Sequence, residues 1–251
     1  MERFPLISCL CLSYQRPELL QNVINSFLSQ TYPNKQLVVI SHKDDTKTAS
    51  VVKSFNNKLI KYFNAPKRSI GELRNFAISK AEGDYFCQWD DDDWYHKDRL
   101  KIQMAEIQKT GKLASVLAYW IMFNKVTNEA YMSAPLMWAG TLLCSKKIFH
   151  NGIKYPKLSK NEDTEFMFKL YRANCLCPIV NPSLYIYVFH GSNTWDANHF
   201  QTLFSSSQKL SVETCNELKK IISHQYSINA ASKILTNPSF VGKLDFFQSW
   251  L

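Results

Sequence analysis

Short apolar runs alternate with segments of helical periodicity over the first half of the chain, and this alternation restricts the fold more than any other feature. The apolar runs have the length of strands and lie at residues 6–13, 36–41, 59–63 and 85–89. Helical patterns separate them, at residues 17–28, 46–55 and 69–81. This β-α-β order predicts an α/β fold with a mostly parallel central sheet and helices on both faces. In such sheets, ligands bind at the carboxyl ends of the strands.

Two of the expected helices begin with a recognisable signal. Pro17 suits a first helical turn, because the N–H that proline lacks has no partner at that position. Ser69 and Glu72 have the spacing of a capping box, in which each side chain accepts a hydrogen bond from the backbone of the other. These signals support the helical interpretation of both segments.

The second half of the chain is less regular. We expect a helix at 98–109, strands at 113–123 and 130–133, an apolar segment at 137–144, a helix at 162–172, a strand at 184–188 and a largely helical stretch at 200–224. Neither an internal repeat nor a low-complexity linker interrupts these segments. The sequence therefore predicts one domain with a helical C-terminal end.

The charge of the chain favours anionic partners. Its 251 residues include 30 Lys and Arg against 21 Asp and Glu, a formal net charge of +9. Nucleotides, phosphorylated lipids and membrane surfaces suit such an excess. The basic residues are scattered, so the sequence predicts no nucleic-acid stripe. A leader pattern and a run of ~20 apolar residues are both lacking, and we expect a cytoplasmic protein.

The seven cysteines are predicted to be reduced thiols of the core. Their number is odd, and most of them lie in apolar surroundings. Cys175 and Cys177 are too closely spaced for a zinc knuckle and have no second pair, so no structural zinc is expected.

Four consecutive aspartates, Asp90–Asp93, directly follow the fourth apolar run. Each close pair of carboxylates costs about 1 kcal/mol even in water, and more in a cleft, so a cation is the expected partner. On an extended backbone Asp90 and Asp92 share one face. There they can hold Mg²⁺ or Mn²⁺ and leave positions for diphosphate oxygens. Trp89 and Trp94 would wall this site.

An acidic surface turn is the plain alternative for these four aspartates. It does not account for their position directly after a buried strand and between two tryptophans. A calcium loop of EF-hand type is excluded. Counted from Asp90, its obligatory glycine is replaced by Tyr95 and its closing glutamate by Lys101.

Several short motifs, taken in order, resemble those of the family 2 glycosyltransferases of GT-A fold over about residues 5–200. Residues 12–17 (LSYQRP) resemble the family's strand-end PTYNRP, and residues 28–33 (LSQTYP) its L.QTYP element. Residues 71–75 (GELRN) resemble G...ARN, and residues 83–85 (GDY) precede the acidic cluster as in that family. Glu162-Asp163 resembles the ED element that carries the acceptor base. Together these motifs imply a GT-A domain.

The resemblance implies a metal and donor site on the acidic cluster. Asp92 would be the principal metal ligand, and Asp90 would contact the metal and the donor ribose. Asp91 joins the donor-binding set. His190 is a candidate third metal ligand, as a C-terminal histidine is in some GT-A enzymes, and a structural histidine is the alternative.

The nucleotide would be bound by residues of the first half. Ser13 and Tyr14 would flank the nucleoside, Arg74 would contact the nucleotide, and Arg16 joins this set. A surface arginine is the alternative for Arg74. The family usually carries Asp-Asp-Gly-Ser after the second strand, whereas residues 41–46 read SHKDDT here, which makes Asp44 the counterpart of the base-binding aspartate.

The catalytic base implied by the resemblance is Asp163, with Glu162 beside it. A carboxylate there would take the proton of the acceptor hydroxyl. The alternative is that these acids only complement the positive end of a helix. Trp138 and Trp195 are candidate stacking platforms for acceptor sugars, with core packing as the alternative.

The sequence thus predicts an inverting glycosyltransferase that uses a nucleotide diphosphate sugar, with Mn²⁺ or Mg²⁺, and a glycan or lipid-linked acceptor. Surface polysaccharide synthesis and peripheral contact with the inner face of the membrane would suit it. We expect a single domain over 1–251, with a nucleotide-sugar-binding half at about 5–125, an acceptor half at 126–200 and a helical extension at 201–251.

Two other classes of protein stay open. A nucleotidyltransferase also needs metal and diphosphate, but its Gly-rich loop is missing, because residues 13–17 contain no glycine. A non-catalytic protein that binds nucleotide-sugars or glycans is the other class. The presence of Asp90, Asp92 and Asp163 argues against a loss of turnover.

Overall fold

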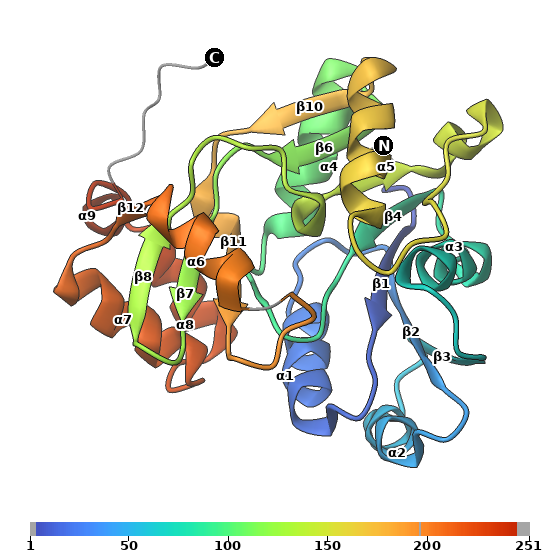
Figure 1. The fold of residues 1–251 in the computed structure, drawn as a ribbon, viewed down its shortest axis with the longest axis horizontal. Helices are drawn as coiled ribbons and strands as arrows, with labels where there is room; N and C mark the ends of the chain where they lie inside the picture. The colour runs from blue at the N-terminus through green and yellow to red at the C-terminus, as the bar shows by residue number, and fades with distance from the viewer. Residues whose placement is uncertain (1–3, 196, 245–251) are drawn as a thin grey trace.

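The computed structural model describes residues 4–195 and 197–244, which form two sheets surrounded by helices (Figure 1). The larger sheet has seven strands in the order β10-β6-β9-β4-β1-β2-β3. They are β1 (Ile7–Leu12), β2 (Lys35–His42), β3 (Ile60–Ala65), β4 (Tyr85–Gln88), β6 (Ala114–Leu117), β9 (Leu143–Ser145) and β10 (Leu176–Ile179). Only β9 in this sheet runs antiparallel to its neighbours, β4 and β6. The predicted mostly parallel sheet is confirmed.

Helices cover both faces of the larger sheet. They are α1 (Pro17–Leu28), α2 (Thr46–Phe55), α3 (Ile70–Lys80), α4 (Arg99–Thr110) and α5 (Glu162–Arg172). Side chains alternate along β1, so Cys9 packs with α1 and α4, whereas Leu10 packs with α3 and α5. The capping box predicted for Ser69 and Glu72 is present at the start of α3. Pro17 begins α1.

The smaller sheet has the strand order β12-β8-β7-β11-β5. Its strands are β5 (Trp94–Tyr95), β7 (Ile121–Asn124), β8 (Glu129–Met132), β11 (Tyr185–Phe189) and β12 (Gln208–Lys209). A separate core joins it to α7 (Val212–Ile222), α8 (Ile228–Leu235) and α9 (Pro238–Val241), in red in Figure 1. Helix α6 (Ala197–Ser205) packs Phe204 on Tyr131 of β8, at 4.7 Å between ring centres.

Short 3-10 helices complete the described chain. They are η1 (Ala139–Thr141), η2 (Lys146–Asn151) and η3 (Pro182–Leu184). All seven cysteines are buried free thiols. Within 4–195 and 197–244, no helix combines the length and the apolar character that crossing a bilayer requires.

Two predicted elements of the second half are wrong in detail. The strand expected at 113–123 is two strands, because the chain leaves the larger sheet after Leu117 and enters the smaller one at Ile121. Apolar character alone does not reveal which sheet a strand joins. The helical stretch expected at 200–224 is interrupted by β12, which pairs with β8. Three consecutive serines, 205–207, end α6, and Ser211 caps α7 through the backbone N–H of Thr214.

Candidate active site

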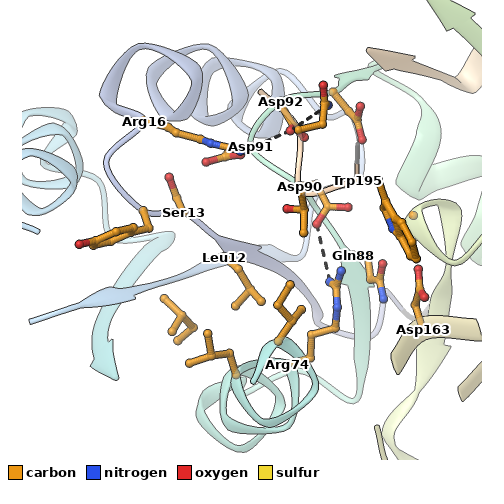
Figure 2. A pocket seen from close by; sticks show the side chains of 18 of the residues that line it. Leu12, Ser13, Arg16, Arg74, Gln88, Asp90, Asp91, Asp92, Asp163 and Trp195 are labelled. Carbon is orange, nitrogen blue, oxygen red and sulfur yellow. Dashed lines mark hydrogen bonds and ion pairs between the residues drawn. The ribbon is translucent and has the colours of Figure 1, made fainter. Parts of the chain in front are cut away.

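A cavity of about 310 Å³ opens at the carboxyl ends of β1, β2 and β4. The first half of the chain lines it with Ser13, Tyr14, Arg16, His42, Arg74, Asp90, Asp91 and Asp92, and the second half with Trp138, Glu162, Asp163, Tyr187 and Trp195. In Figure 2, Ser13 and Asp163 lie on opposite sides of the view, with Asp90 between them. Asp92 and Asp163 are 71 positions apart in the chain, yet they share this cavity.

The acidic cluster lies on a turn, not on an extended strand. Strand β4 ends at Gln88, Asp91 and Asp92 form the turn, and β5 begins at Trp94. The prediction that Asp90 and Asp92 share a face is wrong, because Asp90 pairs with Arg74 whereas Asp91 and Asp92 both face Arg16. The carboxylates diverge because the chain turns at Asp91 and Asp92, between β4 of the larger sheet and β5, which pairs with β11 of the smaller sheet.

Asp93, the last acid of the cluster, anchors this turn to the smaller sheet. Its carboxylate accepts hydrogen bonds from the hydroxyl of Tyr185 and from the backbone N–H of Val188, the latter at 3.0 Å. Burial, and then the charge of Asp92, raise the pKa of Asp93 well above its ordinary value. The contacts of Asp93 are therefore those of a structural residue.

Neither tryptophan that flanks the cluster lines the cavity that contains Asp163, but Trp94 lines a second pocket together with Asp91, Asp92 and Asp93. Trp89 is fully buried and stacks on Tyr95 at 3.9 Å between ring centres. Trp94 packs in the core of the smaller sheet. Trp138 and Trp195, candidate platforms from the sequence, line the cavity instead.

Arg16 is the counter-ion of the acidic turn. Its Nη1 lies 3.1 Å from Asp91 Oδ1 and 3.1 Å from Asp92 Oδ2, and its Nη2 donates to the carbonyl oxygen of Ser192 at 2.9 Å. The other carboxylate oxygen of Asp91, Oδ2, is buried without a hydrogen-bond partner. Burial, reinforced by the charge of Asp92, raises the pKa of Asp91 to about 6. One guanidinium thus compensates two carboxylates only in part.

His190 approaches the same turn from the end of β11. Its Nε2 lies 3.2 Å from Asp92 Oδ2, and its Nδ1 is 2.9 Å from Ser192 Oγ. Asn193 Nδ2 also reaches Asp92, at 3.4 Å. Among the residues that the structure describes, no group of three or more His, Cys, Asp or Glu side chains surrounds one point. Of the predicted ligands, Asp92 and His190 are thus in contact, whereas Asp90 faces Arg74.

Arg74 joins the two halves of the site. Its Nε lies 3.1 Å from Glu162 Oε1, its Nη1 lies 3.6 Å from Asp90 Oδ1, and its guanidinium lies over the ring of Tyr155. Burial raises the pKa of Asp90 and of Glu162, and the charge of Arg74 opposes both shifts. Glu162 is 5% exposed and is engaged as the partner of Arg74.

Glu162 and Asp163 are neighbours in the chain, and Asp163 is the one whose carboxylate remains open to the cavity. Asp163 is the second residue of α5, where its Oδ1 accepts from the backbone N–H of Thr164 at 2.7 Å. Asn161, with a φ of 62°, turns the chain into the helix just before it. Figure 2 shows Asp163 beside Trp195, which lines the same side of the cavity.

The opposite side of the cavity is formed by the ends of β1 and β2. Ser13 Oγ is buried without a hydrogen-bond partner, and the ring of Tyr14 packs edge-on against His42 at 4.8 Å. Sequence reasoning missed His42, although it stands at the carboxyl end of a predicted strand, where ligands bind in such sheets. It also missed Tyr187, which no motif marks.

Asp44 is exposed and lies outside the cavity, with its Oδ2 3.4 Å from the hydroxyl of Tyr14. The buried acid of this segment is Asp45, which caps α2 and also accepts from the backbone N–H of Gln15 at 2.6 Å and from Ser41 Oγ at 2.9 Å. Burial alone would raise the pKa of Asp45, but these hydrogen bonds lower it. Asp45 thereby ties the end of β1 to the end of β2.

Comparison with known proteins agrees with this architecture. Residues 8–173 match the family model described as glycosyl transferase family 2. An uncharacterized glycosyltransferase of Rickettsia felis is 26% identical over 192 residues, which cover 67% of this chain and 32% of the relative. The chondroitin synthase of Pasteurella multocida is 27% identical over 118 residues, 46% of this chain and 12% of that protein. The chain spans about a third, or less, of the length of these two relatives.

Two solved structures have a similar fold. TarS 1-349 from S. aureus, in complex with UDP-GlcNAc, superposes with a TM-score of 0.60 and 18% identity, covering 94% of this chain and 72% of the TarS 1-349 chain. The mannosyltransferase PcManGT from Pyrobaculum calidifontis, in complex with GDP-Man and Mn²⁺, gives 0.61 and 13% identity, covering 96% and 73%. Both likenesses concern the fold. With the family match over residues 8–173, they show that this chain belongs to glycosyl transferase family 2 and has the GT-A type of α/β fold.

Proposed function

We propose that the protein is a metal-dependent, inverting glycosyltransferase that moves a sugar from a nucleotide diphosphate donor to a glycan or lipid-linked acceptor. The observation that carries the proposal is that one cavity joins the acidic turn to Asp163, from opposite halves of the chain. Surface polysaccharide synthesis at the inner face of the membrane is the setting that we propose. The donor half is residues 5–125, the acceptor half 126–200 and the extension 201–251, of which 245–251 lie outside the described residues.

The donor would lie along the first-half side of the cavity. Tyr14 and His42 offer flat surfaces to a nucleoside at the ends of β1 and β2. Ser13 Oγ is a buried polar atom there, close enough to Asp91 to offset part of the rise that burial causes in the pKa of that carboxyl. Solved proteins of this fold hold UDP-GlcNAc and GDP-Man, which supports a nucleotide-sugar donor here.

The side chains of the turn suit a hard divalent cation such as Mn²⁺ or Mg²⁺. Asp92 would be the main ligand, with Asp90, Asp91 and His190 as further candidates, because oxygen-rich sites with a free position are typical of these ions. The unpartnered Oδ2 of Asp91 and the partial compensation by Arg16 fit that assignment. When bound, the cation would supply Lewis-acid stabilisation of the departing diphosphate. Arg16 would bind the charge that grows on the leaving group.

Asp163 would be the base. As the acceptor hydroxyl oxygen bonds to the anomeric carbon, its proton passes to the Asp163 carboxylate, and the bond from that carbon to the diphosphate oxygen breaks. A base on one side of the sugar and a leaving group on the other imply a single displacement with inversion. Arg74 positions this step, since it holds Glu162, the neighbour of Asp163, together with Asp90. Trp138 and Trp195 would flank the acceptor.

The test is a panel of nucleotide-sugars incubated with Mn²⁺, followed by assay of donor hydrolysis and of transfer. Asp163→Asn should lower transfer at least 100-fold, the usual range for loss of a general base. It should leave donor binding, measured by calorimetry, close to that of the native protein. Asp84→Asn is the matched control, because Asp84 is exposed just before β4, at the sheet edge opposite the cavity.

Three outcomes would contradict the assignment. If Asp163→Asn transferred sugar at the native rate, Asp163 could not be the catalytic base. Release of pyrophosphate from a nucleoside triphosphate would indicate a nucleotidyltransferase. Donor binding with no turnover over any acceptor would indicate a binding protein that lacks catalysis.

A further inference from the structure

A basic segment forms the rim of the cavity on the side of Asp163. Residues 151–161 contain Lys154, Lys157 and Lys160 and no acidic residue, and all three lysines are exposed. We propose that the acceptor carries an anionic group, a phosphate or a carboxylate, and that Lys157 and Lys160 bind it. This inference rests on the proposed function and narrows the class of acceptor.

The rim is held in place by packing against α3. The backbone N–H of Gly71 donates to the carbonyl oxygen of Leu158 at 2.9 Å. A Cβ at Gly71 would lie 1.9 Å from the carbonyl oxygen of Pro156, so the close approach requires glycine. Ser159, between the two lysines, lines the cavity. The lysines therefore project from a fixed segment of the wall.

Lys160 marks the acceptor side of the cavity. Its Nζ lies 5.0 Å from the centre of the Trp195 ring, which also lines the cavity. Asp163, the proposed base, follows three residues later. A cation over the face of this tryptophan is stabilised by the ring, and it remains open to a ligand anion. An anionic group held there would sit near the base.

Neither rim lysine forms an ion pair with a carboxylate. In the part of the chain that the structure describes, neither Lys157 nor Lys160 has a carboxylate oxygen within 4 Å of its Nζ. Glu72 accepts from Ser69 in the capping box, and the more distant charge of Lys157 helps to lower the pKa of Glu72, whereas Glu162 pairs with Arg74. The charge of Lys160 is thus available to a ligand, and that of Lys157 is only partly offset by Glu72.

The donor diphosphate is the other anion that these lysines could serve. Its counter-charges lie elsewhere, at Arg16 on the acidic turn and in the divalent cation proposed there. Lys160 contacts Trp195, on the Asp163 side of the cavity. The geometry therefore favours the acceptor as the anion that the rim binds.

The first experiment uses inorganic tripolyphosphate as the probe, titrated calorimetrically without metal. The double variant Lys157→Ala/Lys160→Ala should bind it about tenfold more weakly than the native protein. The matched control is Lys53→Ala/Lys58→Ala, which removes the same charge from the exposed end of α2 and the loop before β3. Equal affinities in the two double variants would overturn the inference, whatever the catalytic activity.

The second experiment measures transfer to three acceptors, a polyisoprenyl phosphate-linked sugar, a uronate oligosaccharide and a neutral oligosaccharide. We expect the enzyme to transfer sugar to one of the two anionic acceptors. In Lys157→Ala/Lys160→Ala the KM of that acceptor should rise about tenfold, while the KM of the donor changes less. The anionic acceptor that the enzyme accepts shows whether the anionic group is a phosphate or a carboxylate. Equal use of the neutral acceptor, insensitive to the rim lysines, would refute the inference and leave the glycosyltransferase proposal standing. Failure of every donor to react would instead refute that proposal, and the tripolyphosphate titration would still decide the role of the rim.

Discussion

Replacing Gly71 by alanine tests how the second half of the site is held against the first. A methyl carbon at this position would lie 1.9 Å from the carbonyl oxygen of Pro156 and 3.2 Å from Cβ of Glu162. Neither the backbone carbonyl nor the helix start can rotate away as a flexible side chain would. The start of α3 and the rim segment must therefore separate by about 1 Å or more to restore van der Waals contact.

The size of the effect follows from three contributions. Alanine favours a helix over glycine by about 1 kcal/mol, which would stabilise the variant if there were no clash. Loss of the hydrogen bond from Gly71 N to Leu158 O, 2.9 Å long, costs about 1 kcal/mol. Overpacking costs roughly 1–3 kcal/mol. The sum is a net destabilisation of about 1–3 kcal/mol, or a fall in Tm of roughly 2–12 °C for a domain of this size.

The assay is thermal unfolding followed by circular dichroism, with donor turnover measured in parallel. Turnover should fall as well, because the same displacement moves Glu162 from Arg74, 3.1 Å away. Gly242→Ala is the control, since Gly242 has ordinary helical dihedrals and its added Cβ would come no closer than 3.3 Å to another atom. A Tm for Gly71→Ala equal to or above that of the native protein would refute the reasoning.

Three further predictions concern buried or paired charges. Arg99→Met should lower the free energy of unfolding in urea by about 1–3 kcal/mol, because the carbonyl oxygen of Gly140, 3.1 Å from Arg99 Nη2, is left without its donor; an unchanged midpoint would contradict this. Burial lowers the pKa of His96, so the unfolded chain takes up a proton at His96 first as the pH falls below about 6.5, and the contribution of His96 to stability should decrease from pH 7.5 to 5.5. Buried Asp91, whose pKa is raised to about 6, contributes with the opposite sign, so the test is a comparison of variants. In urea titrations at the two pH values, His96→Gln should lose less stability, or gain more, on going from pH 7.5 to 5.5 than the native protein, and an identical change in both proteins would exclude a contribution from His96. Arg16→Gln removes the counter-ion of the acidic turn, so Mn²⁺ should raise its Tm more than that of the native protein; an equal or smaller rise would count against the turn as the cation site.

Most of the fold could be predicted from local pattern. The apolar runs and helical segments of the first ninety residues correspond to β1 through β4 with α1, α2 and α3 between them. Local signals were sufficient there, because β1 and β2 are buried along nearly their whole length and α1 buries one apolar face. Prediction failed between Leu117 and Ile121, where one apolar run serves two sheets. It failed again at β12, whose two residues form a strand only because β8 is their partner.

In the candidate site, too, local motifs predicted which residues take part but not which of them contact one another. The motifs located Ser13, Arg74, Asp92 and Asp163, and the structure places all four around one cavity. Motif spacing did not reveal which acids are already engaged. Glu162 pairs with Arg74 over 88 positions of the chain, a partnership that the neighbouring residues do not indicate. Trp89 is likewise buried by packing against Phe27 of α1, a contact that the neighbouring residues do not indicate.

What the sequence by itself determined is the order of the elements and the chemical types at the carboxyl ends of the strands. Local periodicity and short motifs record these directly, because strand burial and helix capping depend on residues a few positions apart. Only the tertiary structure decided which charges meet: Arg16 with the acidic turn, Arg74 with Glu162, and Lys160 with Trp195. Such pairs form between residues brought together by the packing of the two halves of the chain, and their energies depend on distance and burial, which a linear pattern does not contain.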